Sequence, residues 1–226
     1  DPRVVEGLVE SGELDRGRKP EARDISILFS DIRGFTTLSE KMTPEEVVAL
    51  LNPYLEAMSK MINKHGGTVD KYEGDAIIAF FGEPVPFKDH AVRAMRAALD
   101  MRKALTDLKE EWSKEGRPSD IEMGIGVNSG EVFVGLLGSE QRINYTVIGD
   151  NANLAARLQD LTKTYSTPIL ISESTYQQVK HEFEAELVDS VTVKGKTLPV
   201  NVYKVLGRRD AKKVQVEEMT GEAGQA

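Results

Sequence analysis

Residues 68–81 have the sequence TVDKYEGDAIIAFF, in which two strand-like runs flank a short turn. Thr68–Tyr72 and Ala76–Phe81 are rich in β-branched and aromatic residues, and Glu73-Gly74-Asp75 supplies the turn. The pattern predicts a β-hairpin with Asp75 beside the start of an apolar strand. An unpaired carboxylate beside a buried strand is costly, so a chemical role for Asp75 has to be considered.

A second carboxylate, Asp31, follows the strand-like run Ile25–Phe29 in the sequence FSDIRGFT (residues 29–36). Taken alone, Asp31 is better explained as a loop cap and Asp75 as an ordinary turn residue. In a βαββ unit, however, the first strand and the returning hairpin are neighbours, so the two carboxylates would converge. With the carbonyl oxygen of Ile32 they would form a site suited to two hard divalent cations. The pair together therefore favours a metal site.

Helix signals lie on both sides of the hairpin. A Thr43 N-cap with Pro44 and Glu46 starts a helix that ends at His65-Gly66-Gly67. A second amphipathic helix is predicted from Asp89 to about Trp112. Both helices have one apolar face, so we expect them to pack on a sheet.

Two further strands complete the predicted core. They cover Ile121–Val127 and Val132–Leu136, with Asn128–Glu131 as a turn between them. The resulting order βαββαβ predicts an α+β fold with a ferredoxin-like sheet and helices on one face.

The rest of the chain adds C-terminal α/β elements to this core. We expect a helix at about Asn151–Thr162, a strand at Pro168–Ile171, a short helix from Ser172 and a closing hairpin across Val191–Val205. The predicted organisation is one domain at residues 24–207, a linker or short helix from an upstream region at 1–23, and a disordered tail at 208–226.

Composition narrows the class of protein. Hydrophobic residues make up 40% of the 226 residues, which is enough for a sizeable core, and the formal charge of −8 argues against a nucleic-acid or anionic-membrane binder. The absence of cysteine excludes disulfides and thiolate metal sites. No apolar run approaches the ~20 residues of a membrane span and no signal peptide opens the chain, so we expect a cytoplasmic protein. The first residue, Asp1, suggests a fragment or a processed product.

A polar helix face follows in the sequence NYTVIGDNANLAAR (residues 144–157). Asn153 and Arg157 are four residues apart, so they share one face of the predicted helix. Spacing alone leaves a solvated surface and a phosphate- and sugar-binding face equally open. The basic turn VKGK (residues 193–196) is a weak signal of function by itself, because such turns are usually only solvent-exposed connections between strands.

Common catalytic motifs are missing. No Walker loop or dinucleotide fingerprint follows a strand, and neither a Ser-His-Asp set nor an HExxH sequence is visible. These absences count against P-loop enzymes, kinases, dehydrogenases and hydrolases. Lys71 precedes Asp75 by four residues, but a lysine would compete with metals and is not expected to serve the same metal site.

Four motifs occur in an order that resembles a known family. They are FSDIxGFT (residues 29–36), KxxGD (71–75), VxGxxxNxAxR (147–157) and VKGK (193–196). Over about residues 22–206 the chain resembles the class III adenylyl/guanylyl cyclase catalytic domain. The resemblance implies the class III nucleotidyl cyclase fold and a homodimer with active sites at the interface.

The resemblance also assigns roles. It implies that Asp31, Asp75 and the Ile32 carbonyl bind two Mg²⁺ or Mn²⁺ ions. From the other subunit it implies base recognition by Lys71 and Thr146, ribose orientation and transition-state stabilisation by Asn153 and Arg157, and a terminal-phosphate contact by Lys194. It further points to Phe35 and Thr36 as substrate-binding residues. In that arrangement Lys71 would face the partner's site and not its own metals.

Base chemistry favours ATP over GTP. Adenine offers an acceptor at N1 and a donor amine at N6, which match the donor-only Lys71 and the hydroxyl oxygen of Thr146. Guanine reverses both groups and would suit a Glu at position 71. Thr146 replaces the commoner Asp of the family, and because a hydroxyl also donates, it discriminates less firmly. With Lys and Thr at these two positions, the chain resembles a subclass of the family that includes bicarbonate-responsive cyclases. The resemblance therefore points to bicarbonate as a possible effector, by association alone.

The expected activity is conversion of ATP to 3′,5′-cyclic AMP and pyrophosphate, under an upstream regulatory domain. Three alternatives stay open: a guanylyl cyclase, a degenerate nucleotide-binding or dimerisation module, and a palm-type polymerase or diguanylate cyclase. The last would carry a Gly-Gly-Asp/Glu-Glu-Phe-like hairpin, whereas this hairpin has Tyr72-Glu73-Gly74-Asp75.

Overall fold

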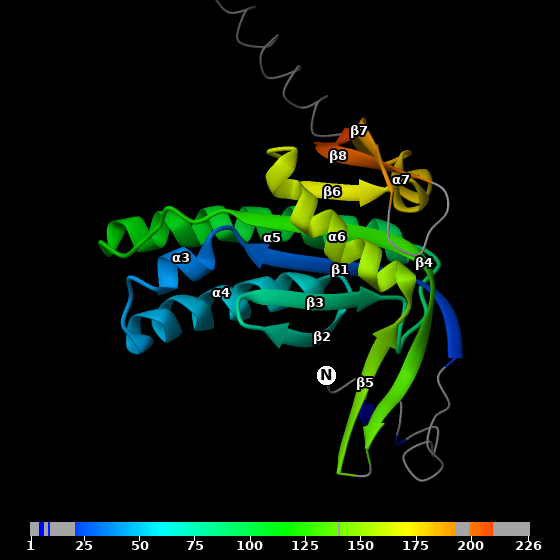
Figure 1. Cartoon of the computed structure of the whole chain (residues 1–226), viewed down its shortest axis with the longest axis horizontal. Helices are drawn as coiled ribbons and strands as arrows, with labels where there is room; N and C mark the ends of the chain where they lie inside the picture. Colours follow the sequence, from blue (N-terminus) through cyan, green and yellow to red (C-terminus); the bar gives the residue numbers. More distant parts are fainter. Residues whose placement is uncertain (1–4, 7–8, 10–20, 140, 193–198, 210–226) are drawn as a thin grey trace, which may run out of the picture.

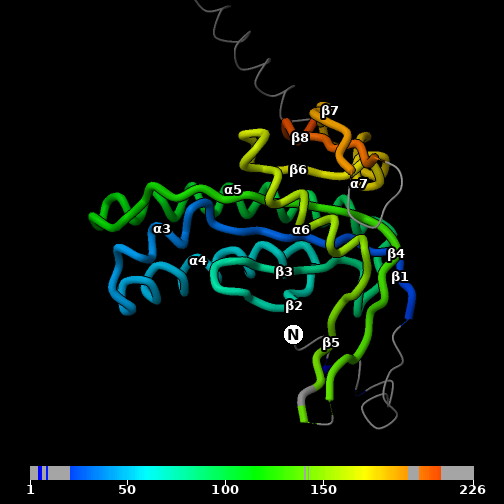
Figure 2. Tube along the Cα trace, viewed as in Figure 1, coloured from blue at the N-terminus to red at the C-terminus, as the bar shows by residue number. Residues whose placement is uncertain are grey.

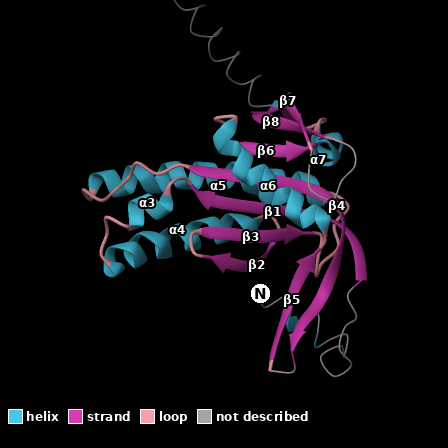
Figure 3. Ribbon diagram, in the orientation of Figure 1, coloured by secondary structure: helices cyan, strands magenta, loops and turns pink. Residues whose placement is uncertain are grey.

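The computed structural model describes residues 5–6, 9, 21–139, 141–192 and 199–209. Within these residues eight strands form one sheet in the order β2-β3-β1-β4-β6-β8-β7, with β5 paired to β4 (Figures 1 and 3). The strands are β1 Glu21–Ile32, β2 Thr68–Glu73, β3 Ala76–Phe81, β4 Met123–Ser139, β5 Arg142–Ile148, β6 Ile169–Ser172, β7 Phe183–Val191 and β8 Val200–Arg208. The helices are α3 Phe35–Ser39, α4 Pro44–Lys64, α5 His90–Lys114, α6 Asp150–Thr164 and α7 Glu173–Val179.

The predicted βαββαβ order is present as β1-α4-β2-β3-α5-β4. β1 lies between β3 and β4 and is antiparallel to both. The predicted start of α4 is also observed, because Thr43 and Glu46 exchange the two hydrogen bonds of a capping box behind Pro44. No helix in the described ranges is long and apolar enough to cross a membrane.

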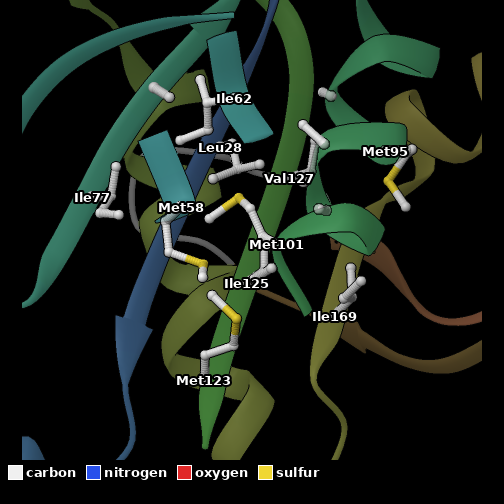
Figure 4. Packing of buried hydrophobic residues seen from close by; sticks show 14 of the residues in the cluster. Leu28, Met58, Ile62, Ile77, Met95, Met101, Met123, Ile125, Val127 and Ile169 are labelled. Atoms are coloured by element: carbon white, nitrogen blue, oxygen red, sulfur yellow. The ribbon is translucent and has the colours of Figure 1, made fainter. Parts of the chain in front are cut away.

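Helices α4 and α5 cover one face of this core. Alternate strand residues, including Leu28, Ile77 and Ile125, point to that face and pack against Met58 and Met101 (Figure 4). All five side chains are fully buried. The hydrophobic layer holds β1, β3 and β4 in place, and these strands carry or flank both predicted acidic residues.

Helix α6 covers the opposite face, where the prediction had placed no helix over the core. Gly124 and Gly126 of β4 make this possible, because a Cβ at Gly126 would lie only 2.3 Å from the carbonyl oxygen of Ala155. The helix therefore packs with its backbone directly against the strand. Its inward residues Leu154 and Leu158 are buried, which fixes the outward direction of the remaining side chains.

The predicted turn at Asn128–Glu131 is wrong, because β4 runs unbroken through it. Ser129 and Gly130 pair with Ser26 and Ile25 of β1 in regular antiparallel register. The polar side chains are satisfied inside the fold: Asn128 Nδ2 donates to the Asn151 carbonyl at 2.8 Å, and the hydroxyls of Ser129 and Ser26 lie 2.6 Å apart. Turn-prone residues can thus continue a strand when tertiary partners take their hydrogen bonds.

Other boundaries also differ from the sequence prediction. β5 was not predicted, and the closing hairpin is longer than Val191–Val205, since it begins at Phe183 and ends at Arg208. β1 begins at Glu21, inside the predicted linker. Arg208, the first residue of the predicted tail at 208–226, is the last residue of β8. The tail from residue 210 onward and the predicted turn at 193–196 lie outside the described residues.

Candidate active site

The structure brings Asp31 and Asp75 together. Asp31 lies in β1 next to its end, and Asp75 lies in the β2–β3 turn, which the antiparallel pairing of β1 with β3 places alongside. Asp75 Oδ2 accepts a hydrogen bond from the Ile32 N–H at 3.0 Å, and the two carboxyl groups are within hydrogen-bonding reach of each other. The predicted convergence of the two acids is therefore observed.

This acidic pair has an unfavourable electrostatic environment without a cation. Burial, followed by the hydrogen bond with Asp31 and the negative charge of Asp31, raises the pKa of Asp75 to about 7. A proton or a cation relieves the repulsion between two carboxylates held this close. Since both side chains offer oxygen ligands only, the pair fits a hard ion such as Mg²⁺ or Mn²⁺.

Side chains alone do not complete a metal site here. Among the described residues no cluster of three or more His, Cys, Asp or Glu side chains could hold a metal ion. Further ligands would have to be backbone oxygens, water or substrate phosphates, which is common for Mg²⁺. The donor set fits an ion that arrives with a polyphosphate.

A pH prediction follows from the raised pKa of Asp75. Between the ordinary carboxyl range and about pH 7, Asp75 holds a proton in the folded protein but not in the unfolded chain. With a chelator present, the free energy of unfolding therefore falls as the pH rises through that window. Mn²⁺ competes with this proton, so its stabilising effect should be larger at about pH 8 than at about pH 6. Thermal unfolding with EDTA or Mn²⁺ measures both effects. An Asp75→Asn variant should flatten both, and identical curves for wild type and variant would contradict the prediction.

The loop after Asp31 is anchored by Arg33, which the sequence analysis did not single out. Its guanidinium donates to the carbonyl oxygen of Thr162 in the last turn of α6 at 3.1 Å and to that of Thr167, just beyond the helix, at 2.7 Å. Gly34 follows with φ 69°, a left-handed conformation that favours glycine. The loop that would carry the Ile32 carbonyl ligand is thereby tied to the helix on the other face of the sheet.

Phe35 and Thr36 lie in the short helix α3. Phe35 is half-buried and packs against the main hydrophobic core, whereas Thr36 is exposed and its carbonyl accepts a hydrogen bond from Ser39. These contacts give Phe35 a packing role. Substrate binding by either residue stays a prediction.

Tyr54 of α4 is a further residue near the acidic pair that the sequence did not reveal. It is fully buried, and burial raises the pKa of its hydroxyl well above the ordinary value. The negative charges of Asp75 and Asp31 act in the same direction. The Tyr54 hydroxyl is therefore neutral and lies near the two carboxylates.

Lys71 and Thr146 both contact the carboxylate of a third residue, Asp70. The Thr146 hydroxyl donates to Asp70 Oδ2 at 2.9 Å, and Lys71 Nζ lies 3.6 Å from the same oxygen. Burial raises the pKa of Asp70, while the hydrogen bond from Thr146 and the charge of Lys71 lower it. The predicted base-recognising residues are thus neighbours, beside a pocket of about 540 Å³ between β2 and β5 that Lys71 helps to line.

Asn153 and Arg157 lie in the first two turns of α6 and are exposed. Their side chains make no hydrogen bond or ion pair with any other residue in the described part of the chain. Figure 1 shows the end of β1 and the β2–β3 turn at the left of the sheet, whereas α6 begins at the right. Within the residues that the structure describes, no hydrogen bond or ion pair joins this pair to the acidic residues. Lys194 lies outside the described residues.

Comparison with known proteins identifies the family. The adenylate and guanylate cyclase catalytic domain matches residues 18–207. The chain belongs to this family. The predicted class III cyclase fold is confirmed by solved cyclase structures, and divalent metal ions are in general use across the family.

Three relatives illustrate the similarity of this cyclase domain. An adenylate cyclase of Anabaena cylindrica is 43% identical over 190 residues, which are 81% of this chain and 37% of that protein. The adenylyl cyclase CyaB from P. aeruginosa has a TM-score of 0.79 and 38% identity over 85% of this chain and 99% of that chain. The guanylyl cyclase Cya2 has a TM-score of 0.77 and 39% identity over 84% of this chain and 95% of that chain.

Two features of these matches bear on the function of this cyclase domain. The chain spans only 9% to 37% of the length of the first curated relatives. Adenylyl and guanylyl cyclases also match it at nearly equal identity, 38% and 39%. The preferred base therefore has to be argued from individual side chains.

Proposed function

We propose that this domain converts ATP to 3′,5′-cyclic AMP and pyrophosphate at sites shared by two copies of the chain. The observation that carries the proposal is the separation of two complementary groups within one protomer. An acidic pair lies at one end of the sheet, while the exposed Asn153–Arg157 face begins at the other end. In the proposed assembly, a second copy brings them together. Relatives named adenylate cyclase support the activity.

An exposed apolar surface supports the assembly of two copies. The β4–β5 hairpin extends beyond the rest of the sheet (Figure 2). Phe133, Leu137 and Ile148 on it are 55%, 47% and 45% exposed. Phe133 pairs with Ile148, and Leu137 lies on the same face by strand alternation. A surface of this kind is typical of a protein–protein contact.

The proposed chemistry is attack of the ribose 3′-oxygen on the α-phosphate. The new bond joins the 3′-oxygen to the α-phosphorus. The bond between the α-phosphorus and the oxygen that bridges it to the β-phosphate breaks, and pyrophosphate leaves. The proton of the 3′-hydroxyl passes to solvent. Asp31 and Asp75 would hold the divalent ions, with the Ile32 carbonyl as an additional ligand. When bound, such ions acidify the hydroxyl and neutralise phosphate charge.

The partner's side chains would orient the substrate and meet the developing charge. Asn153 would hold the ribose so that the 3′-oxygen is in line with the leaving group. Arg157 would donate to the phosphate oxygens as their charge increases, and one such donor lowers a barrier by about 3–4 kcal/mol. Lys194 would contact the terminal phosphate.

Base recognition would come from Lys71 and Thr146, with Lys71 donating to adenine N1 and Thr146 accepting from the N6 amine. The presence of Asp31, Asp75, Asn153 and Arg157 argues against a degenerate binding module. A bicarbonate response and control by an upstream domain stay predictions.

A product assay tests the proposal. With Mn²⁺, the chain should form cyclic AMP from ATP with a kcat/KM at least about tenfold above that for cyclic GMP from GTP, since both base contacts are mismatched with guanine. Chromatography of the products identifies them. Preference for GTP would indicate a guanylyl cyclase. Nucleotide binding without any cyclic product would indicate a binding module and remove the enzymatic proposal.

A further inference from the structure

A β-bulge in β2 gives Asp70 its unusual position. Val69 pairs with Ala79 of β3, and the next paired residue, Lys71, faces Ile78, so Asp70 is an extra residue without a ladder partner. Val69 packs against the core beneath α4. Under strict alternation Lys71 would face the same side as Val69. The bulge turns Lys71 to the opposite face and leaves Asp70 beside it.

Asp70 is almost completely enclosed and makes two directed contacts. Its side chain is only 3% exposed, whereas that of Lys71 is about half exposed. Oδ2 accepts the Thr146 hydroxyl hydrogen at 2.9 Å and lies 3.6 Å from Lys71 Nζ. Residues 70 and 146 are far apart in the sequence, so this buried carboxylate joins the hairpin to β5.

The contact fixes the hydrogen-bonding direction of Thr146. An ionised carboxylate is only an acceptor, and a hydroxyl has a single hydrogen. Once Thr146 donates that hydrogen to Asp70, its oxygen can only accept from a ligand. The same carboxylate attracts Lys71, which is only a donor. The two groups then present one donor and one acceptor side by side.

We propose that Asp70 is a positioning residue that sets the preference for adenine by holding the Thr146 hydroxyl as an acceptor beside the donor Lys71. The inference rests on the proposed function, in which Lys71 and Thr146 contact the base. Adenine N1 and its N6 amine complement this pair. Guanine N1–H would face the Lys71 donor, and guanine O6 would face the Thr146 oxygen. Asp70 itself does not touch the nucleotide.

Asp70→Asn tests this role. An Asn side chain offers both a donor and an acceptor, so it no longer fixes the direction of the Thr146 hydroxyl, whose hydrogen becomes available to guanine O6. The ratio of kcat/KM for ATP to that for GTP should fall about tenfold, the discrimination expected of one reversed hydrogen bond. In a Thr146→Val background the same substitution should change the ratio less than about twofold, because the effect passes through the hydroxyl. A tenfold change in both backgrounds would overturn the role assigned to Asp70.

Glu83→Gln is the matched control. Its carboxylate is also buried, with a side chain 6% exposed, and it pairs with Arg23 at 3.0 Å and accepts from Tyr145, the neighbour of Thr146, at 3.2 Å. The substitution should lower the melting temperature without changing the ATP-to-GTP ratio. If it lowers the ratio as much as Asp70→Asn does, a general loss of packing explains the effect and the inference fails.

The results separate this inference from the proposed function. A wild-type chain that forms no cyclic nucleotide, or prefers GTP, removes the proposed function itself. A wild-type chain that prefers ATP, with an unchanged ratio in folded Asp70→Asn, overturns only the inference. If Asp70→Asn does not fold, Asp70→Ser is assayed in its place, because a hydroxyl also donates and accepts and does not fix the direction of Thr146. A fall of about tenfold in the ATP-to-GTP ratio supports the inference, and an unchanged ratio overturns it.

Discussion

A mixture of Asp31→Ala and Arg157→Ala chains is expected to regain cyclase activity that neither variant has alone. Loss of the guanidinium should reduce kcat by about 10²–10³-fold, and loss of one of the two acidic ligands should be at least as severe. In a mixed dimer both lesions fall in one site, and the other site is intact. Random exchange in a two-fold dimer should therefore restore about a quarter of wild-type activity, measured as cyclic AMP formed.

The matched control for this experiment is a mixture of Asp31→Ala and Asp75→Ala chains. Both residues belong to the same acidic pair, so every site in their mixed dimer carries one lesion. This mixture should stay inactive. Subunit exchange is verified by co-purification of differently tagged chains. Recovery in the control, or no recovery in the first mixture despite confirmed exchange, would contradict the shared site.

Lys71→Glu is expected to shift base use strongly toward GTP. The substitution replaces a donor with an acceptor, which repels adenine N1 and accepts from guanine N1–H. Loss of one hydrogen bond and gain of the reverse one should lower the ATP-to-GTP ratio of kcat/KM by about 10²-fold. Initial rates with each nucleotide and Mn²⁺ measure the ratio.

Lys103→Glu serves as the control for the change in charge. Lys103 is exposed on α5 and pairs with Asp107 one helical turn away. Its substitution reverses the same charge far from the proposed base site, so the ATP-to-GTP ratio should not change. If Lys71→Glu also leaves the ratio unchanged, Lys71 takes no part in base recognition.

The convergence of the acidic pair could be predicted because it depends on local patterns. A strand ending near Asp31 and a hairpin turning at Asp75 become neighbours in any βαββ unit, whatever the rest of the chain does. The position of Lys71 on the outer face could not be predicted in the same way. It depends on the bulge at Asp70, and strict period-2 alternation would have pointed Lys71 toward α4.

Residues whose partners come from distant segments were missed or misread. Asp70 hydrogen-bonds Thr146 on β5, a strand the sequence did not predict. Asn128 and Ser129 have turn propensity, but contacts with α6 and β1 keep them in a strand. In each case a tertiary hydrogen bond outweighs the local preference, and local sequence patterns do not reveal that hydrogen bond.

The glycine contact between β4 and α6 bears on how the catalytic groups could move. At Gly126 the helix backbone rests on the strand with no intervening side-chain layer, and Arg33 holds the far end of the same helix. A helix seated in this way has no soft layer on which to slide. Arg157 and the acidic loop of each protomer thus belong to one rigid body. In the proposed dimer, the gap between the arginine of one subunit and the metals of the other would open or close by rotation of whole subunits.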